Sequence, residues 1–225
     1  MGKSSIILIP ACIVLLACSK NDMLPEPAGE TIRFSATMAD DATKALLEDD
    51  DIQTNETVVK ICGYAGGNPL SDGGSPATTM SDLSLTCGSD GKWTLPKTFK
   101  WQYNTDHQFY GWLDTDARSG LTASGFFSGF SYSSTDRQIT IPAKTSDSHL
   151  DFAYSDVVMR STSMADYSTV VLPMEHLFTS FSLAAHNYTT SGITISSVKL
   201  YGIHNNKGAV ITFGSTGTSV EYTRG

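Results

Sequence analysis

The chain has 225 residues, of which 40% are hydrophobic and 10% aromatic, and its formal net charge at pH 7 is −8. This apolar content is enough for a packed core and excludes an intrinsically disordered chain. Nucleic-acid binding is excluded as well, because contact with a phosphate backbone requires clustered Lys and Arg, and the sequence has no basic run.

An export signal is predicted at the N-terminus. Lys3 precedes an apolar run over residues 6–16, which Pro10 interrupts. A membrane-spanning helix needs about 20 apolar residues, so this shorter run is typical of the hydrophobic region of a signal peptide. The run leads to Ala17, a small residue directly before Cys18, and cleavage is expected between these two residues.

Residues 15–18 (Leu-Leu-Ala-Cys) resemble the lipobox of bacterial lipoproteins, in which the cysteine after the cut is acylated. The resemblance implies a lipoprotein signal peptide over residues 1–17 and a lipid on Cys18. A plain secretory signal is the alternative, but it does not require a cysteine after the cut. Residues 18–30 have two prolines and no apolar periodicity, and are predicted to be a flexible tether.

The first strand is predicted over residues 31–37. Its apolar residues occupy every second position, which is the period of a half-buried strand, so Ile32, Phe34 and Ala36 are expected to face a core. Residues 39–55 follow as a predicted loop with an acidic cluster. The cluster lacks the alternating oxygen ligands and the glycine of a calcium-binding loop, so it is predicted to be solvated.

Beyond this loop, strand patterns recur about every ten residues, separated by turns rich in Gly and Ser, with no long amphipathic helix. Regularly spaced short strands predict an all-β fold in which two sheets pack face to face. We expect an N-terminal β-sandwich domain over residues 31–160. Its further strands are expected at 57–64, 92–95, 98–103, 108–113, 138–142 and 150–154.

A second block of strand patterns covers residues 167–225. A strand at 170–172 is expected to lead into 176–185, and further strands are expected at 193–195, 197–201 and 209–213. A helix is the competing interpretation of 176–185. About four strands are barely enough for a sandwich with a covered core. The block is therefore predicted to be the start of a second, incomplete β-sandwich domain.

Two cysteines, Cys62 and Cys87, remain after the signal and the acylated Cys18 are set aside. An exported location permits a disulfide between them. Two buried thiols are the other interpretation, and the apolar, strand-like surroundings of both residues favour it.

A succession of blocks spans the chain from Cys18 to about Phe213. The blocks are the lipobox and residues 32–36, 43–45, 59–64, 93–113, 151–154 and 172–177 through 197–200. Each block alone is weak, but in this order they resemble the fimbrillin family of gut and oral anaerobes. The resemblance implies two transthyretin-like β-sandwich domains in tandem, in a lipoprotein of the outer membrane that is assembled into type V fimbriae.

The resemblance also implies a mechanism of assembly. A surface protease that cuts after Arg or Lys removes the lipidated first strand, and a neighbouring subunit fills the groove by β-strand addition. In this chain the displaced strand would carry Ile32, Phe34 and Ala36, and the cut would fall between Lys44 and Ala45. A solvated loop lysine explains Lys44 equally well. The implied partners are other fimbrial subunits, the outer membrane through the lipid anchor, and the arginine/lysine-specific protease.

Catalytic function is not predicted. The sequence has no Gly-x-Ser-x-Gly, His-Glu-x-x-His, Walker or Gly-x-Gly-x-x-Gly motif. Its five histidines are scattered without metal-ligand spacing. We therefore expect no catalytic residue, no metal site and no cofactor.

A surface-anchored glycan-binding lipoprotein is the alternative function. Trp93, Trp101, Tyr103, Tyr110 and Trp112 fall within twenty residues, and exposed aromatic rings are able to stack on sugars. Alternation along the predicted strands places several of these rings on common faces, as a sandwich core requires. The aromatic block is therefore predicted to be core, with a stacking platform as the competing interpretation.

Overall fold

The structure is a computed structural model that describes residues 29–39, 57–116, 121–123, 129–142, 152–161, 167–177, 186–197 and 206–224. Every element assigned within these residues is a β-strand, so the predicted all-β class is confirmed. None of the described residues belongs to a helix that is both long and apolar enough to cross a membrane. The strands are β1 (Phe34–Met38), β2 (Val58–Ala65), β3 (Asn68–Pro69), β4 (Leu83–Cys87), β5 (Trp93–Thr94), β6 (Asp106–Asp116), β7 (Leu121–Thr122), β8 (Ser131–Ser133), β9 (Gln138–Ile141), β10 (Ala153–Ser155), β11 (Val158–Ser161), β12 (Val170–His176), β13 (Asn206–Phe213) and β14 (Thr218–Arg224).

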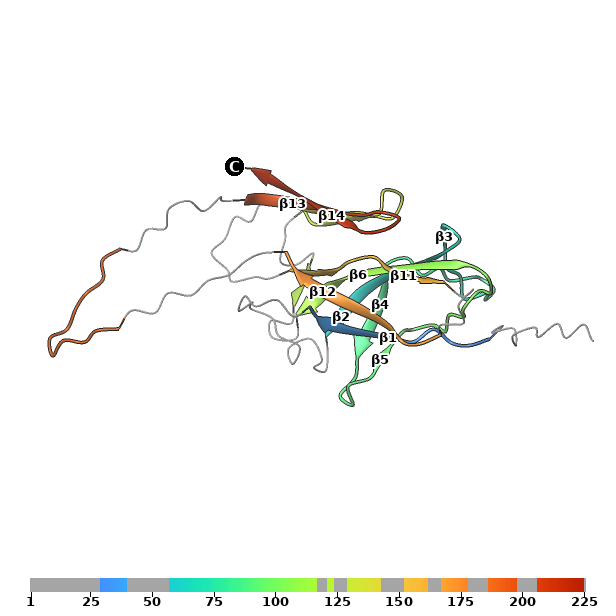
Figure 1. Ribbon diagram of the computed structural model, residues 1–225, viewed down its shortest axis with the longest axis horizontal. Helices are drawn as coiled ribbons and strands as arrows, with labels where there is room; N and C mark the ends of the chain where they lie inside the picture. Colours follow the sequence, from blue (N-terminus) through green and yellow to red (C-terminus); the bar gives the residue numbers. More distant parts are fainter. Residues whose placement is uncertain are drawn as a thin grey trace, which may run out of the picture.

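A large mixed sheet forms the body of the molecule (Figure 1). Its main path runs β1-β12-β10-β6-β2-β4-β5, while β11 and β7 pair with β6, and β3 pairs with β2. The pair β1–β12 is parallel and the other pairs in this sheet are antiparallel. The long strand β6 pairs with β2 along the whole length of β2. These two strands form the centre of the sheet.

The large sheet curls until its two ends nearly meet. The backbone N–H of Ile32, just before β1, donates to the carbonyl of Phe99, just after β5, at 2.9 Å. A second bond from Trp101 to the carbonyl of Glu30, at 3.1 Å, lies beside it. Sheet closure of this kind shields the edges that an open sheet exposes.

The concave side of the curled sheet encloses the first apolar core. On β2 the alternation places Val59 and Ile61 in this core, opposite Phe109 and Leu113 from β6. Phe34 packs edge-on against Phe109, with ring centroids 5.2 Å apart. Period-2 alternation sends the intervening residues of both strands to the convex side.

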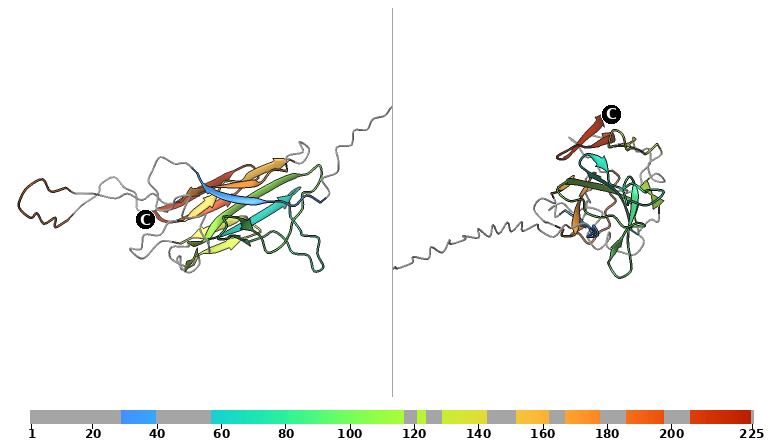
Figure 2. Two further views of the ribbon diagram at one scale, coloured as in Figure 1. Left: turned by 90° about the horizontal axis from the view of Figure 1, so that it is seen from below. Right: turned by 90° about the vertical axis from the view of Figure 1, so that its right-hand side faces the viewer.

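A small antiparallel sheet covers part of that convex side. Its order is β14-β13-β9-β8, and it forms a separate layer over the large sheet in Figures 1 and 2. A second apolar core fills the space between the layers, where Tyr110 from β6 stacks on Phe213 from β13 at 4.1 Å. The described part of the molecule is therefore built from two sheets, of which the large one is curled and nearly closed.

Strands from both ends of the chain share these sheets. β12 lies between β1 and β10 in the large sheet, and β13 pairs with β9 in the small one. The strands after residue 167 thus pair directly with strands before residue 160. The domain boundary predicted between residues 31–160 and residues 167–225 would separate strands that pair with each other.

Two predicted strands are wrong within the described residues. Residues 98–103 form no strand and make one isolated bridge, Thr31–Lys100, because they cross from one sheet end to the other. Residues 193–195 are irregular, with Ile193 61% and Ile195 57% exposed, and their segment stands away from both sheets in Figure 1. The predicted element at 176–185 lies outside the described residues after Leu177, and the predicted strand at 197–201 lies outside them after residue 197.

Candidate functional site

The first strand, β1, lies at the end of the large sheet. β12 is its one strand partner in the described part of the chain, through five residue pairs from Phe34–Val170 to Met38–Met174. Three residues of this segment are almost fully buried: Ile32 at 4%, Phe34 at 6% and Ala36 at 1% exposure. β1 thus contributes apolar side chains to the core, while no strand of the described residues pairs with its other edge.

A groove of about 420 Å³ separates β1 from β5. Apolar side chains line it from both strands and from β4, among them Phe34, Leu85 and Trp93. Arg33 and Lys97 also line the groove. The free edge of β1 therefore faces an apolar hollow rather than open solvent.

Three residues assigned roles from the sequence lie outside the described part of the chain. These are the lipidation site Cys18 and the processing site at Lys44 and Ala45. The described chain ends at Ala39 after β1 and begins again at Thr57 before β2. The processing site is thus in the connection between the first strand and the centre of the large sheet.

Cys62 and Cys87 are free, buried thiols. The backbone N–H of Cys87 on β4 donates to the carbonyl of Thr57 at 3.2 Å, so Cys87 lies opposite a position five residues before Cys62. At about 3.3 Å per strand residue this offset is about 16 Å, whereas a disulfide needs Cα atoms within about 7 Å. The strand register therefore keeps the thiols apart.

The aromatic block is divided between the two cores. Trp101, Tyr110 and Trp112 are at most 2% exposed, so they present no flat surface on which a sugar could stack. Trp93 is partly buried against the first core, and Tyr103 is 51% exposed. A continuous aromatic platform is not formed by these five residues.

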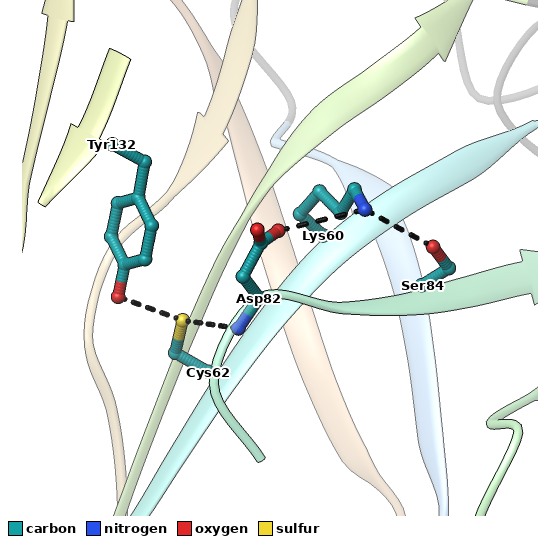
Figure 3. A network of polar contacts seen from close by, with 5 residues as sticks. All are labelled: Lys60, Cys62, Asp82, Ser84 and Tyr132. Atoms are coloured by element: carbon teal, nitrogen blue, oxygen red, sulfur yellow. Dashed lines mark hydrogen bonds and ion pairs between the residues drawn. The ribbon is translucent and has the colours of Figure 1, made fainter. Parts of the chain in front are cut away.

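A polar network lies on the convex side of β2 (Figure 3). The Lys60 ammonium is 3.6 Å from the Asp82 carboxylate and donates to Ser84 Oγ at 3.3 Å. The Cys62 sulfur accepts a bond from the backbone N–H of Asp82 at 3.2 Å and lies 3.0 Å from the Tyr132 hydroxyl. The network joins the large sheet to β8 of the small sheet.

Hydroxyl groups extend this network into the second core. Tyr132 Oη is 3.0 Å from Tyr110 Oη, which is 3.2 Å from Tyr64 Oη. Burial raises the pKa of the Cys62 thiol and of the Tyr110 and Tyr132 phenols. These groups are neutral at physiological pH, and a neutral buried thiol is a poor nucleophile. The chain of hydroxyls therefore packs the sheets together and offers no activated group.

A pocket of about 330 Å³ opens beside the network. Burial raises the pKa of Asp82 and Asp114 in its wall, although the Lys60 ammonium acts in the opposite direction on both. The indole N–H of Trp112 is buried and has no acceptor among the described residues. The pocket is lined by Lys60, Asp82, Trp112, Asp114, Phe130, Ser131 and Tyr132.

The wall of this pocket does not resemble a metal centre. No group of three or more His, Cys, Asp or Glu side chains suited to a metal ion occurs among the described residues. The pocket was also not predicted from the sequence, because Asp82 and Tyr132 come from stretches where no strand is expected. Among the lining residues, Lys60 and Trp112 lie on predicted strands, at 57–64 and 108–113, where the sequence gives a signal.

Comparisons of the chain with models of known protein families, with curated proteins and with solved structures find no match. Function is therefore inferred from the residues and geometry of this chain.

Proposed function

We propose that the protein is a structural subunit or accessory component of cell-surface fimbriae, exported as a lipoprotein and assembled by strand exchange. The observation that supports this most directly is the position of β1. Within the described ranges it is a terminal strand with one strand partner, its apolar side chains enter the core, and a groove follows its other edge. Such a strand can be exchanged without opening the centre of the sheet.

Loss of β1 would leave two unsatisfied surfaces. The edge of β12 would lose the backbone partners that β1 supplies over five residue pairs. The sites of Ile32, Phe34 and Ala36 would open into the groove as apolar hollows. An incoming strand with apolar residues at alternate positions satisfies both surfaces, through ladder hydrogen bonds and filled pockets.

The remaining parts of the proposal come from the N-terminal sequence. Signal peptidase releases residues 1–17, a lipid on Cys18 holds the precursor in the outer membrane, and a protease specific for Arg or Lys cuts between Lys44 and Ala45. This cut detaches the tether together with β1. The proposal also includes a more detailed fold than the all-β class: a transthyretin-like sandwich, with two such domains in tandem.

The N-terminal residue and mass of the protein at its native cell surface test this proposal. Assembled material is expected to begin at Ala45, and unassembled precursor to begin at an acylated Cys18. A matched Cys18→Ser variant should take up no fatty-acid label, while a Cys12→Ser variant should label normally because Cys12 leaves with the signal. Surface protein that begins elsewhere and carries no lipid would contradict the proposal.

A further inference from the structure

Residues 99–105, hereafter the strap, lie between the β5 end of the large sheet and the start of β6. Two backbone bonds fasten the strap to the segment before β1. The Ile32 N–H donates to the carbonyl of Phe99 at 2.9 Å, and beside it the Trp101 N–H donates to the carbonyl of Glu30 at 3.1 Å. The side chains of Phe99 and Trp101 are buried in the first core. The strap therefore closes the curled sheet and holds the chain where β1 begins.

The ring of His107, near the start of β6, fastens the strap to the body of the sheet. The strap turns at residues 103–104, and the ring bonds the backbone on both sides of this turn. Its Nε2 accepts from the backbone N–H of Gln102 at 3.2 Å, and its Nδ1 is 3.0 Å from the carbonyl oxygen of Thr105. The same ring packs edge-on against Trp101, with ring centroids 4.9 Å apart.

This pair of bonds fits only the neutral imidazole. Nδ1 faces a carbonyl oxygen and carries the proton, so Nε2 keeps the lone pair that accepts from the Gln102 N–H. A second proton would make Nε2 a donor, and two N–H groups would then face each other. The side chain of His107 is also inaccessible to solvent, where a charge is costly because water cannot reach it.

The groups around His107 act on its charge in both directions. Burial lowers the pKa of His107 below its ordinary value of 6.5, whereas the Thr105 carbonyl and the Asp106 carboxylate act to raise it. Arg160 on β11 is the cross-strand partner of His107, so its positive charge opposes an imidazolium. Ala65, the partner on β2, is apolar. The further titratable groups on the strap side are Glu30, Tyr103 and Tyr167.

The neutral form of His107 is thus the one that holds the strap. Its contribution is complete above pH 6.5 and is lost as the pH falls from 6.5 through the lowered pKa. We propose that protonation of His107 releases the strap from β6 and from the segment before β1, so that mild acid opens this end of the curled sheet. The proposal does not depend on a fimbrial role, because it concerns only bonds within this chain.

Hydrogen exchange of backbone amides in the full chain tests the proposal. Protection factors, which remove the intrinsic pH dependence of exchange, are compared at about pH 7.5 and about pH 5. The amides of Ile32 and Trp101 report on the strap. The amide of Gly63 on β2, which donates to the carbonyl of Met80 at 2.8 Å, reports on global unfolding. Protection of the strap amides should fall about tenfold in acid, and protection of Gly63 should not change.

His107→Gln is the diagnostic variant, because a glutamine amide offers the Gln102 N–H an acceptor and does not titrate in this range. Its strap amides should be equally protected at both pH values. His186→Gln is the matched control: His186 is exposed in a segment away from the sheets, so acid should still release the strap. NMR titration of the His107 ring in the unaltered protein needs no variant, and the loss of protection should follow protonation of this ring.

Four outcomes would overturn the proposal. The first is equal protection of the strap amides at the two pH values, and the second is the same loss in acid in His107→Gln as in the unaltered protein. The third is a parallel loss at Gly63, which would indicate global unfolding. The fourth is protonation of the His107 ring outside the pH interval in which protection is lost.

Discussion

At the scale of single residues, Phe34 connects the first strand to the core. Its ring is 6% exposed and packs edge-on against Phe109, whereas Ser35 is only partly buried on the opposite side of β1. Phe34→Ala is therefore expected to lower the free energy of unfolding by about 3–5 kcal/mol. Ser35→Ala, one position away, should change it little. Chemical denaturation measures both, and equal losses would show that β1 does not alternate.

The carboxyl of Asp114 predicts a pH dependence. Burial raises its pKa above the ordinary value of 3.8, so its neutral form is the one that folding favours. The stability that this group contributes is complete below pH 3.8 and is lost as the pH rises through the raised pKa. Asp114→Asn keeps a neutral group, so it should lose less stability than the wild type between pH 4 and pH 7.

Asp90 supplies a control of opposite sign. A hydrogen bond from Lys92 lowers its pKa, so its contribution is present above pH 3.8 and is lost as the pH falls. Asp90→Asn should therefore differ from the wild type at pH 7 and approach it in acid. Denaturation midpoints at pH 7, at pH 4 and at about pH 2 compare the three proteins: the interval from pH 4 to pH 7 tests Asp114, and the interval below pH 4 tests Asp90. The same direction of change in both variants would contradict the burial of Asp114.

At the scale of elements, the pairing of β2 with β6 depends on a glycine. A Cβ atom added to Gly111 would lie 2.5 Å from the carbonyl oxygen of Lys60, and neither strand can withdraw because both are paired on their other sides. Gly111→Ala should lower the thermal midpoint clearly. Gly192→Ala is the control, because nothing lies within 4 Å of its added Cβ. A similar midpoint for both variants would contradict the close approach.

The strands that the sequence predicts are those with a clear period. β1, β2, β5, β6 and β9 overlap the expected ranges, as do parts of β10, β12 and β13. Alternation of apolar and polar residues is the main signal in these ranges. No strand was expected at β4, β8, β11 or β14. β8 and β14 are rich in Ser and Thr and show no clear alternation of apolar and polar residues. Whether such a segment forms a strand depends on its neighbours in the fold, which cannot be read from the local sequence.

The pocket lined by Lys60, Asp82, Trp112 and Tyr132 could not be predicted from a local period either. Lys60 and Trp112 lie on strands that were expected, and their placement on one face follows from alternation. Asp82 and Tyr132 reach the pocket only because β4 pairs with β2 and because the small sheet covers the large one. Tertiary pairing therefore creates this site, and no motif in the sequence contains it.

At the scale of the whole molecule, the order of strands in space differs from their order along the chain. The first strand pairs with β12, which is separated from it by more than a hundred residues, and β13 pairs with β9. β1 is therefore held by a late part of the chain while its covalent link leads to β2. A cut in that link leaves the contacts of β1 intact but removes its connection to the body.

This connection decides whether β1 exchanges. In the uncut chain the strand competes as an intramolecular partner at an effective concentration in the millimolar range, so an added peptide cannot displace it. If a protease sequence is inserted after Lys44 and cut, β1 is held only by non-covalent contacts: its pairing with β12, its side chains in the core, and the backbone bonds that join Glu30 and Ile32 to the stretch after β5. A labelled peptide of residues 31–39 should then be taken up by cut protein and not by uncut protein.

The side chains of the peptide make this prediction specific. A peptide with Phe34→Asp should not be taken up, because the carboxylate would enter the apolar site beside Phe109. A peptide with Ser35→Asp should be taken up almost normally, because this position faces away from that core. Native gel filtration with fluorescence detection follows both peptides. Uptake by uncut protein, or equal uptake of the two altered peptides, would show that β1 is not the exchangeable strand.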